Sequence, residues 1–79
     1  MKEKIVKILN EIRPEFDFET SQNYFENGML DSFDVITLVT TLDETFSISI
    51  EGVDILSDNF NDLNKIIDLL QKYGVNHES

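Results

Sequence analysis

The sequence of 79 residues contains no cysteine and a single histidine, His77. The absence of cysteine excludes disulfide bonds, thiolate metal sites and cysteine nucleophiles. His77 lies in a polar C-terminal segment, residues 75–79, that we expect to fray. At this length only about 60% of the surface of the unfolded chain becomes buried, which argues against a deep catalytic pocket. The sequence therefore predicts neither an enzyme nor a metal site.

The sequence also lacks any apolar run close to the ~20 residues that a membrane-spanning helix requires. The N-terminus, Met1-Lys2-Glu3-Lys4, leads into an amphipathic stretch and not into the apolar core of a signal peptide. We therefore expect a soluble cytoplasmic protein that does not insert into membranes.

Basic residues are absent from the middle of the chain. All six lie outside residues 14–64, whereas that stretch contains twelve of the sixteen carboxylates. The formal net charge of −10 repels nucleic acid and anionic membranes and favours basic partner surfaces. From charge alone, this acidity fits either a merely solvated face or a surface that meets a basic partner.

Apolar residues recur at helical spacing and predict an all-α fold, a small four-helix bundle in a single domain. The expected helices are, in chain order, residues 3–12, 32–46, 53–56 and 62–73, of which the third is short. Pro14 ends the first helix, and Gly74 caps the last. The long loop that follows the first helix contains six large apolar side chains, so we expect it to pack over the core.

The helix expected at residues 32–46 is supported by its period more than by its propensity. It contains seven β-branched residues, and residues 47–50 alternate in the manner of a strand. A period near 3.6 nevertheless favours a helix, because tertiary packing overrides weak propensity. The inner stripe of this helix is expected to comprise Ile36, Val39, Leu42 and Phe46.

A glycine-containing loop meets the start of this helix at Gly28-Met29-Leu30-Asp31-Ser32. Asp31 is a suitable N-cap, and Asp34 can reach back to it as in a capping box. If Asp31 caps the helix, the Ser32 hydroxyl is free and lies at the positive end of the helix dipole, where a phosphodiester is favoured. From these residues alone, the simpler interpretation is that Ser32 is itself the N-cap and has no other role. No histidine lies near it in sequence to activate it as a hydrolase nucleophile.

The segment Leu30-Asp31-Ser32-Phe33, followed by Val39, Leu42-Asp43-Glu44, Phe46, Ile48 and Ile50, resembles the acyl and peptidyl carrier protein family over nearly the whole chain. In that family a dedicated transferase attaches 4′-phosphopantetheine from coenzyme A to a serine that opens the second helix. The resemblance implies that Ser32 is this serine and that Asp31 engages the transferase. It also implies a monomeric carrier that presents acyl or aminoacyl thioesters. Its expected partners are a phosphopantetheinyl transferase, a loading ligase and a downstream transferase or synthase.

The resemblance further implies a partner surface on the second helix. The expected surface comprises Phe33, Asp34, Thr37, Thr40, Asp43 and Glu44. Asp43 and Glu44 lie in the last turn, where carboxylates oppose the helix dipole and no nearby base relieves them. Such local conflicts are typical of functional surfaces, where a basic partner can supply the missing charge.

Several departures from the usual family pattern narrow the type of carrier that this sequence resembles. Carriers of the fatty-acid pathway usually read Gly-x-Asp-Ser-Leu, whereas here Gly28 lies one residue further upstream and Phe33 follows the serine. Thr37 and Thr40 also stand where those carriers tend to have glutamate and methionine. These features resemble free-standing D-alanyl carriers and the carriers of polyketide or non-ribosomal peptide assembly.

A fatty-acid synthesis carrier remains open, as does a small acidic helical adaptor that binds a basic groove and uses Ser32 only as a cap. A calcium module at residues 54–62 is excluded, because the segment lacks the central glycine and the closing glutamate of an EF-hand loop.

Overall fold

The computed structural model describes residues 1–75, which form three α-helices and two short 3₁₀ helices and no strand. The α-helices are α1 (Lys2–Ile12), α2 (Ser32–Phe46) and α3 (Leu63–Lys72), and the 3₁₀ helices are η1 (Gly52–Asp54) and η2 (Ser57–Phe60). The prediction of an all-α fold is confirmed. The short third helix expected at residues 53–56 is replaced by η1 and η2, so three α-helices, and not four, build the fold. One cause is Asn59, whose side chain donates to the Asp54 carbonyl at 2.8 Å and occupies an acceptor that a continuing helix would use.

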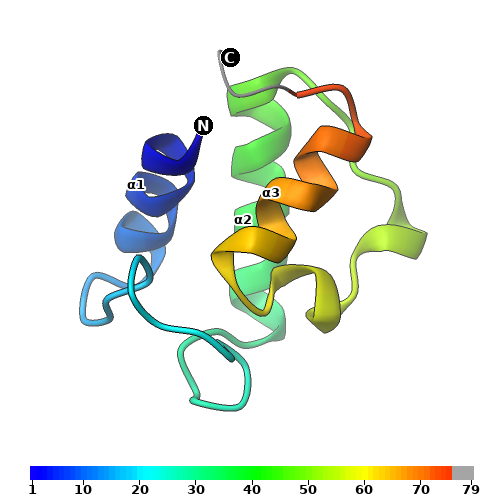
Figure 1. The fold of residues 1–79 in the computed structure, drawn as a ribbon. Coiled ribbons are helices and arrows are strands. Elements are labelled where there is room, and N and C mark those ends of the chain that lie inside the picture. Colours follow the sequence, from blue (N-terminus) through cyan, green and yellow to red (C-terminus); the bar gives the residue numbers. More distant parts are fainter. Residues whose placement is uncertain (76–79) are drawn as a thin grey trace.

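α1 packs against both α2 and α3, and η2 joins α2 to α3. α1 and α2 lie side by side and run in opposite directions, and α3 crosses in front of α2 in Figure 1. η2 contacts both α2 and α3, while η1 lies at the outer edge of the molecule. The start of α2 therefore lies at the opposite end of the molecule from the N-terminus (Figure 1). Within residues 1–75, no helix is both long and apolar enough to cross a membrane.

The inner face of α2 is rotated from the one expected. Its buried apolar residues are Val35, Leu38, Val39 and Leu42. Val39 and Leu42 were expected there, but Ile36 is exposed and Phe46 is only partly buried. Val35 and Ile36 both fit a helical period, so sequence spacing does not distinguish them. In the structure α2 packs against α1 and η2, and Val35 lies on its buried side while Ile36 lies on its exposed side.

The loop between α1 and α2 packs over the core as expected. Phe18 and Tyr24 are fully buried, with ring centroids 5.0 Å apart in an edge-to-face arrangement. The Tyr24 hydroxyl donates to the Phe18 carbonyl. Asn61 ties the loop to the segment before α3. Its carbonyl accepts from the Tyr24 N–H at 2.8 Å, and its side-chain oxygen accepts from the Phe25 N–H at 3.1 Å.

Tyr24→Phe should lower the free energy of unfolding by about 1–2 kcal/mol, because the buried Phe18 carbonyl loses its hydrogen bond. Burial raises the pKa of Tyr24 to about 12. The neutral hydroxyl therefore contributes fully below the ordinary pKa of 10.0, and its contribution is lost as the pH rises through the folded-state pKa. Urea unfolding at neutral pH measures the change, and an unchanged midpoint would contradict this account.

α3 ends in a Schellman motif. Gly74 has φ +87°, its N–H donates to the Gln71 carbonyl at 3.0 Å, and the Val75 N–H donates to the Leu70 carbonyl at 3.1 Å. Gly74 thus follows the end of the helix as the sequence predicts. Val75, which the sequence places in a frayed tail, is buried against the core. The rest of that predicted tail, with His77, lies outside the described residues.

Candidate functional site

Ser32 is the first residue of α2, and it is exposed. The residue before it, Asp31, is the N-cap, with extended backbone angles. Asp31 Oδ1 accepts from the Asp34 N–H at 3.0 Å, and Asp34 Oδ2 accepts from the Asp31 N–H at 3.2 Å. This reciprocal capping box confirms that Asp31 caps α2. The Ser32 hydroxyl is therefore released from a capping role.

The loop before α2 fixes where the helix begins. Gly28 adopts φ +71°, a left-handed conformation that glycine tolerates without strain. The next two residues, Met29 and Leu30, are buried, and both of their N–H groups donate to the Tyr24 carbonyl, at 2.8 and 3.3 Å. The chain is thus anchored up to the residue before Asp31, and the exposed segment begins at the cap.

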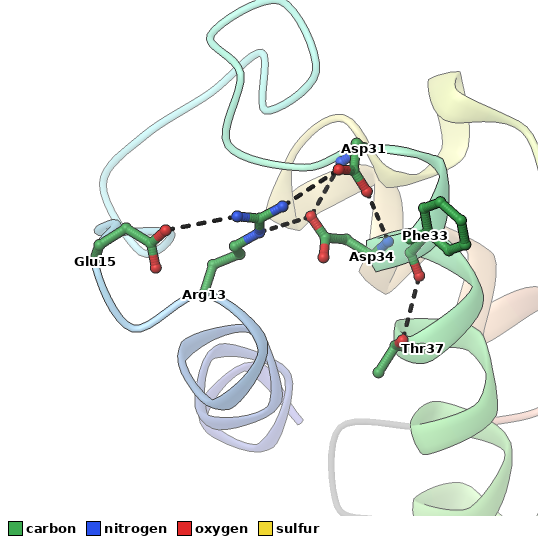
Figure 2. A network of polar contacts seen from close by, with 6 residues as sticks. All are labelled: Arg13, Glu15, Asp31, Phe33, Asp34 and Thr37. Atoms are coloured by element: carbon green, nitrogen blue, oxygen red, sulfur yellow. Dashed lines mark hydrogen bonds and ion pairs between the residues drawn. The ribbon is translucent and has the colours of Figure 1, made fainter.

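Arg13 reaches this capping box from the C-terminal end of α1 (Figure 2). Its Nε donates to Asp34 Oδ2 at 2.8 Å, and its Nη2 donates to Asp31 Oδ2 at 3.3 Å. Nη1 lies 3.6 Å from Glu15 Oε2. The hydrogen bond to Asp34 raises the pKa of Arg13 above its ordinary value. Arg13 was not among the predicted site residues, although it is the last base before the base-free stretch.

Asp34 does not belong to the exposed surface predicted from the sequence. Its residue is 9% exposed, and its carboxylate faces Arg13 and the Asp31 N–H (Figure 2). This is a correction, and its physical cause is the capping box together with the ion pair, which turn the carboxylate inward. Asp31, in contrast, is exposed.

Asp43 is half-buried and forms a hydrogen bond with the segment that follows α2. Its Oδ1 accepts from the Ile50 N–H at 3.0 Å, so one of the two carboxylates that oppose the helix dipole has an internal partner. Sequence patterns do not reveal this contact, because it joins a helix to the loop beyond its end. Glu44, the other carboxylate, is exposed.

The outer face of α2 is less polar than its composition indicates. Thr37 and Thr40 are exposed, but their hydroxyls donate to the carbonyls of Phe33 and Ile36, at 3.2 and 3.0 Å. Figure 2 shows the Thr37 bond, with the Phe33 ring pointing away from the Arg13 network. The threonine hydroxyls therefore bond to their own helix, as is common for this residue type.

Large exposed apolar side chains lie on α2 and on the segment that contains η1. Within residues 1–75 they are Phe33 (81% exposed) and Ile36 (61%) on α2, Val53 (75%) in η1 and Leu56 (56%) just after it. A shallow groove joins the two segments, and its lining includes Ser32, Ile36 and Ile55. These four exposed side chains are termed the apolar surface, and of the four only Ile36 lines the groove that contains Ser32. The sequence identified only Phe33, because helical spacing assigned Ile36 to the core.

The sequence matches a family model described as "Phosphopantetheine attachment site" over residues 2–70. The chain belongs to the phosphopantetheine-binding carrier protein family. It is 32% identical over 73 residues to a D-alanyl carrier protein of Lactobacillus delbrueckii subsp. bulgaricus, a match that covers 91% of each chain. It is 35% identical over 68 residues to a D-alanyl carrier protein of Leuconostoc mesenteroides, covering 85% of this chain and 87% of the relative.

This carrier protein holds acyl or aminoacyl intermediates on a covalently attached 4′-phosphopantetheine arm. The start of α2 fits such a group, because an exposed hydroxyl lies in the first turn of a 15-residue helix, where unpaired N–H groups favour a phosphodiester. The terminal thiol of the arm supplies the thioester chemistry. Within residues 1–75, no cluster of three or more His, Cys, Asp and Glu side chains is arranged to hold a metal ion.

Proposed function

We propose that Ser32 carries the phosphopantetheine arm and that the cargo of this carrier is D-alanine. The capping box carries the first part of the proposal, because it assigns the cap to Asp31 and leaves an exposed serine hydroxyl beside it. The relatives that are named D-alanyl carrier proteins and that align with 85% or more of the chain support the second part.

Attachment transfers a phosphopantetheinyl group from coenzyme A to the serine oxygen. Ser32 Oγ would bond to the phosphorus that bears the pantetheine of coenzyme A, while the phosphoanhydride bond breaks and adenosine 3′,5′-bisphosphate leaves. The hydroxyl proton must pass to a base. Residues 1–75 contain no histidine, and the adjacent carboxylate, Asp31, already accepts from the Asp34 N–H and from Arg13. We therefore assign the base to a separate phosphopantetheinyl transferase. The carrier itself is then not an enzyme, and a ligase loads it and a transferase unloads it.

We propose that these partners dock on the apolar surface in order to reach Ser32. Its side chains supply contact area, and the exposed carboxylates of Asp31 and Glu44 steer basic partners toward it. Exposed Thr37 and Thr40 lie on the same helix, and Asp43 lies half-buried at its end. Because a net charge of −10 opposes self-association, we further propose a monomer. We place it in the cytoplasm, where coenzyme A is available.

Intact-mass measurement tests the proposal in two stages. Incubation with coenzyme A and a broad-specificity phosphopantetheinyl transferase should add one phosphopantetheinyl group, and peptide mapping should place it on Ser32. The loaded carrier should then accept D-alanine from a D-alanine-activating ligase and ATP, in preference to L-alanine. If the carrier gains the arm but accepts only another acid, the assignment of D-alanine as the cargo is wrong. The assignment of Ser32 as the attachment site would still stand.

Phe33→Ser should slow both modification and loading by about tenfold, because truncating an exposed anchor in an interface typically costs more than 1 kcal/mol. The melting temperature should change by no more than about 2 °C, since the ring is 81% exposed. Asn10→Ser on the exposed face of α1 is the control and should leave both rates unchanged. Equal rates for the Phe33 variant and the parent would show that Phe33 does not belong to the partner surface.

A further inference from the structure

We infer that Arg13 is a positioning residue that keeps α2 in the register in which Asp31, and not Ser32, caps the helix. It does so by bridging the two carboxylates of the capping box (Figure 2). The Ser32 hydroxyl then stays free for attachment. This inference rests on the proposed role of Ser32, but its main test does not require the arm.

The capping box of α2 concentrates negative charge. In the usual box a neutral serine or threonine caps the helix and one acidic or amide side chain reaches back. Here Asp31 and Asp34 are both carboxylates, and each accepts from the backbone N–H of the other. The N-terminal end of a helix offsets only about half an elementary charge. Two adjacent carboxylates therefore need a further positive charge.

Arg13 supplies that charge in a geometry that preserves the box. Within residues 1–75 it is the only base that forms an ion pair with either Asp31 or Asp34. It bonds to Asp31 through Oδ2, which leaves Oδ1 to accept the Asp34 N–H. Asp34 Oδ2 accepts from both Arg13 Nε and the Asp31 N–H. A planar guanidinium can reach two carboxylates through different nitrogens, whereas a lysine ammonium acts as a point charge.

Arg13 is itself held in place by α1. It is the C-terminal cap of that helix, and its N–H donates to the Leu9 carbonyl at 2.9 Å. Its backbone angles, φ −136° and ψ 80°, are non-helical, as expected for a residue before Pro14. Because α1 packs against α2, the guanidinium is presented to the capping box from a fixed neighbour.

Ser32 is the competing cap. Serine and aspartate are about equally good N-caps, so a helix that begins one residue later can be capped by the Ser32 hydroxyl. That hydroxyl would accept from the N–H of Val35, which in this structure donates to the Asp31 carbonyl at 3.0 Å. Without Arg13, the buried Asp34 carboxylate loses its counter-charge and the two carboxylates repel each other. The shifted register then becomes favourable, and the hydroxyl turns toward the helix, away from an incoming donor.

A double-mutant cycle on thermal unfolding tests this competition. In the parent, Ser32→Ala should change the melting temperature by no more than about 2 °C, because the hydroxyl caps nothing. In the Arg13→Gln background the same change should lower it by about 4–8 °C, because the hydroxyl has become the cap. Amide hydrogen exchange should report the same shift, since the Asp34 N–H loses protection in Arg13→Gln.

The rate of modification provides the functional readout. Arg13→Gln should accept phosphopantetheine about tenfold more slowly than the parent, as expected for the loss of charge-assisted hydrogen bonds. Arg13→Lys should fall between the two. Lys7→Gln, which removes the same charge from an exposed position on α1, is the matched control and should keep the parent rate.

Several outcomes would overturn the inference. An equal effect of Ser32→Ala in both backgrounds means that Arg13 does not control the register. A parent-like rate for Arg13→Gln means that any role of Arg13 is purely structural. If Arg13→Gln does not fold, Arg13→Gln/Asp34→Asn replaces it, because a neutral amide can still accept the Asp31 N–H. In that variant Ser32→Ala should again have little effect, and a large effect would exclude charge repulsion as the cause. A parent that no transferase modifies would refute the proposed function alone.

Discussion

Ser32→Ala should abolish the attachment of phosphopantetheine while the melting curve of the protein stays almost unchanged. The loss is complete because attachment needs the oxygen atom itself, and no other residue can replace Ser32 Oγ at this position in the first turn of α2. The stability is preserved because Asp31 already provides the cap. Had Ser32 been the cap, the same substitution would cost about 1 kcal/mol. Intact mass and thermal unfolding, measured on the same preparations, separate the two roles.

Ser57→Ala is the matched control for this experiment. Ser57 is exposed and lines the same shallow groove as Ser32, so a transferase that docks on this surface passes close to it. The Ser57 variant should gain one arm at the parent rate. An alanine variant at Ser32 that still gains the arm, or a Ser57 variant that does not, would show that the attachment residue has been misassigned.

Asp34→Lys should lower the free energy of unfolding by about 2–3 kcal/mol, because it removes one half of the capping box and places two cations side by side. Glu44→Lys reverses the same charge at an exposed position and should change the stability by no more than about 0.5 kcal/mol. Urea unfolding of the two variants provides the comparison. Similar losses for both would contradict the inward placement of the Asp34 carboxylate.

The two variants should also differ in how they affect partners. Glu44→Lys should slow loading at low salt, and the difference from the parent should shrink at high salt, because exposed charges are screened. The defect of Asp34→Lys should persist at high salt, since it arises from the disrupted start of α2. A salt-insensitive defect in Glu44→Lys would argue against electrostatic steering by that residue.

The sequence by itself determined the features that depend on residues close together along the chain. The expected helices at residues 3–12, 32–46 and 62–73 agree with α1, α2 and α3 to within one residue at each end. The glycine after α3 was also predictable, and the sequence narrowed the cap of α2 to two adjacent residues, Asp31 and Ser32. Helical period, capping and chain reversal each involve residues within about four positions of one another, so the order of amino acids is enough to reveal them.

Only the tertiary structure decided which side chains face inward and what they meet there. Val35 and Ile36 satisfy the same period, and neighbouring elements buried the first and exposed the second. Asp34 and Asp31 were readable as a box, but the guanidinium that bridges them comes from Arg13, 21 positions before Asp34. The Ile50 N–H likewise satisfies Asp43 from beyond the end of the helix. Contacts between distant segments depend on how whole helices pack. The pattern of neighbouring residues in the sequence does not reveal that packing.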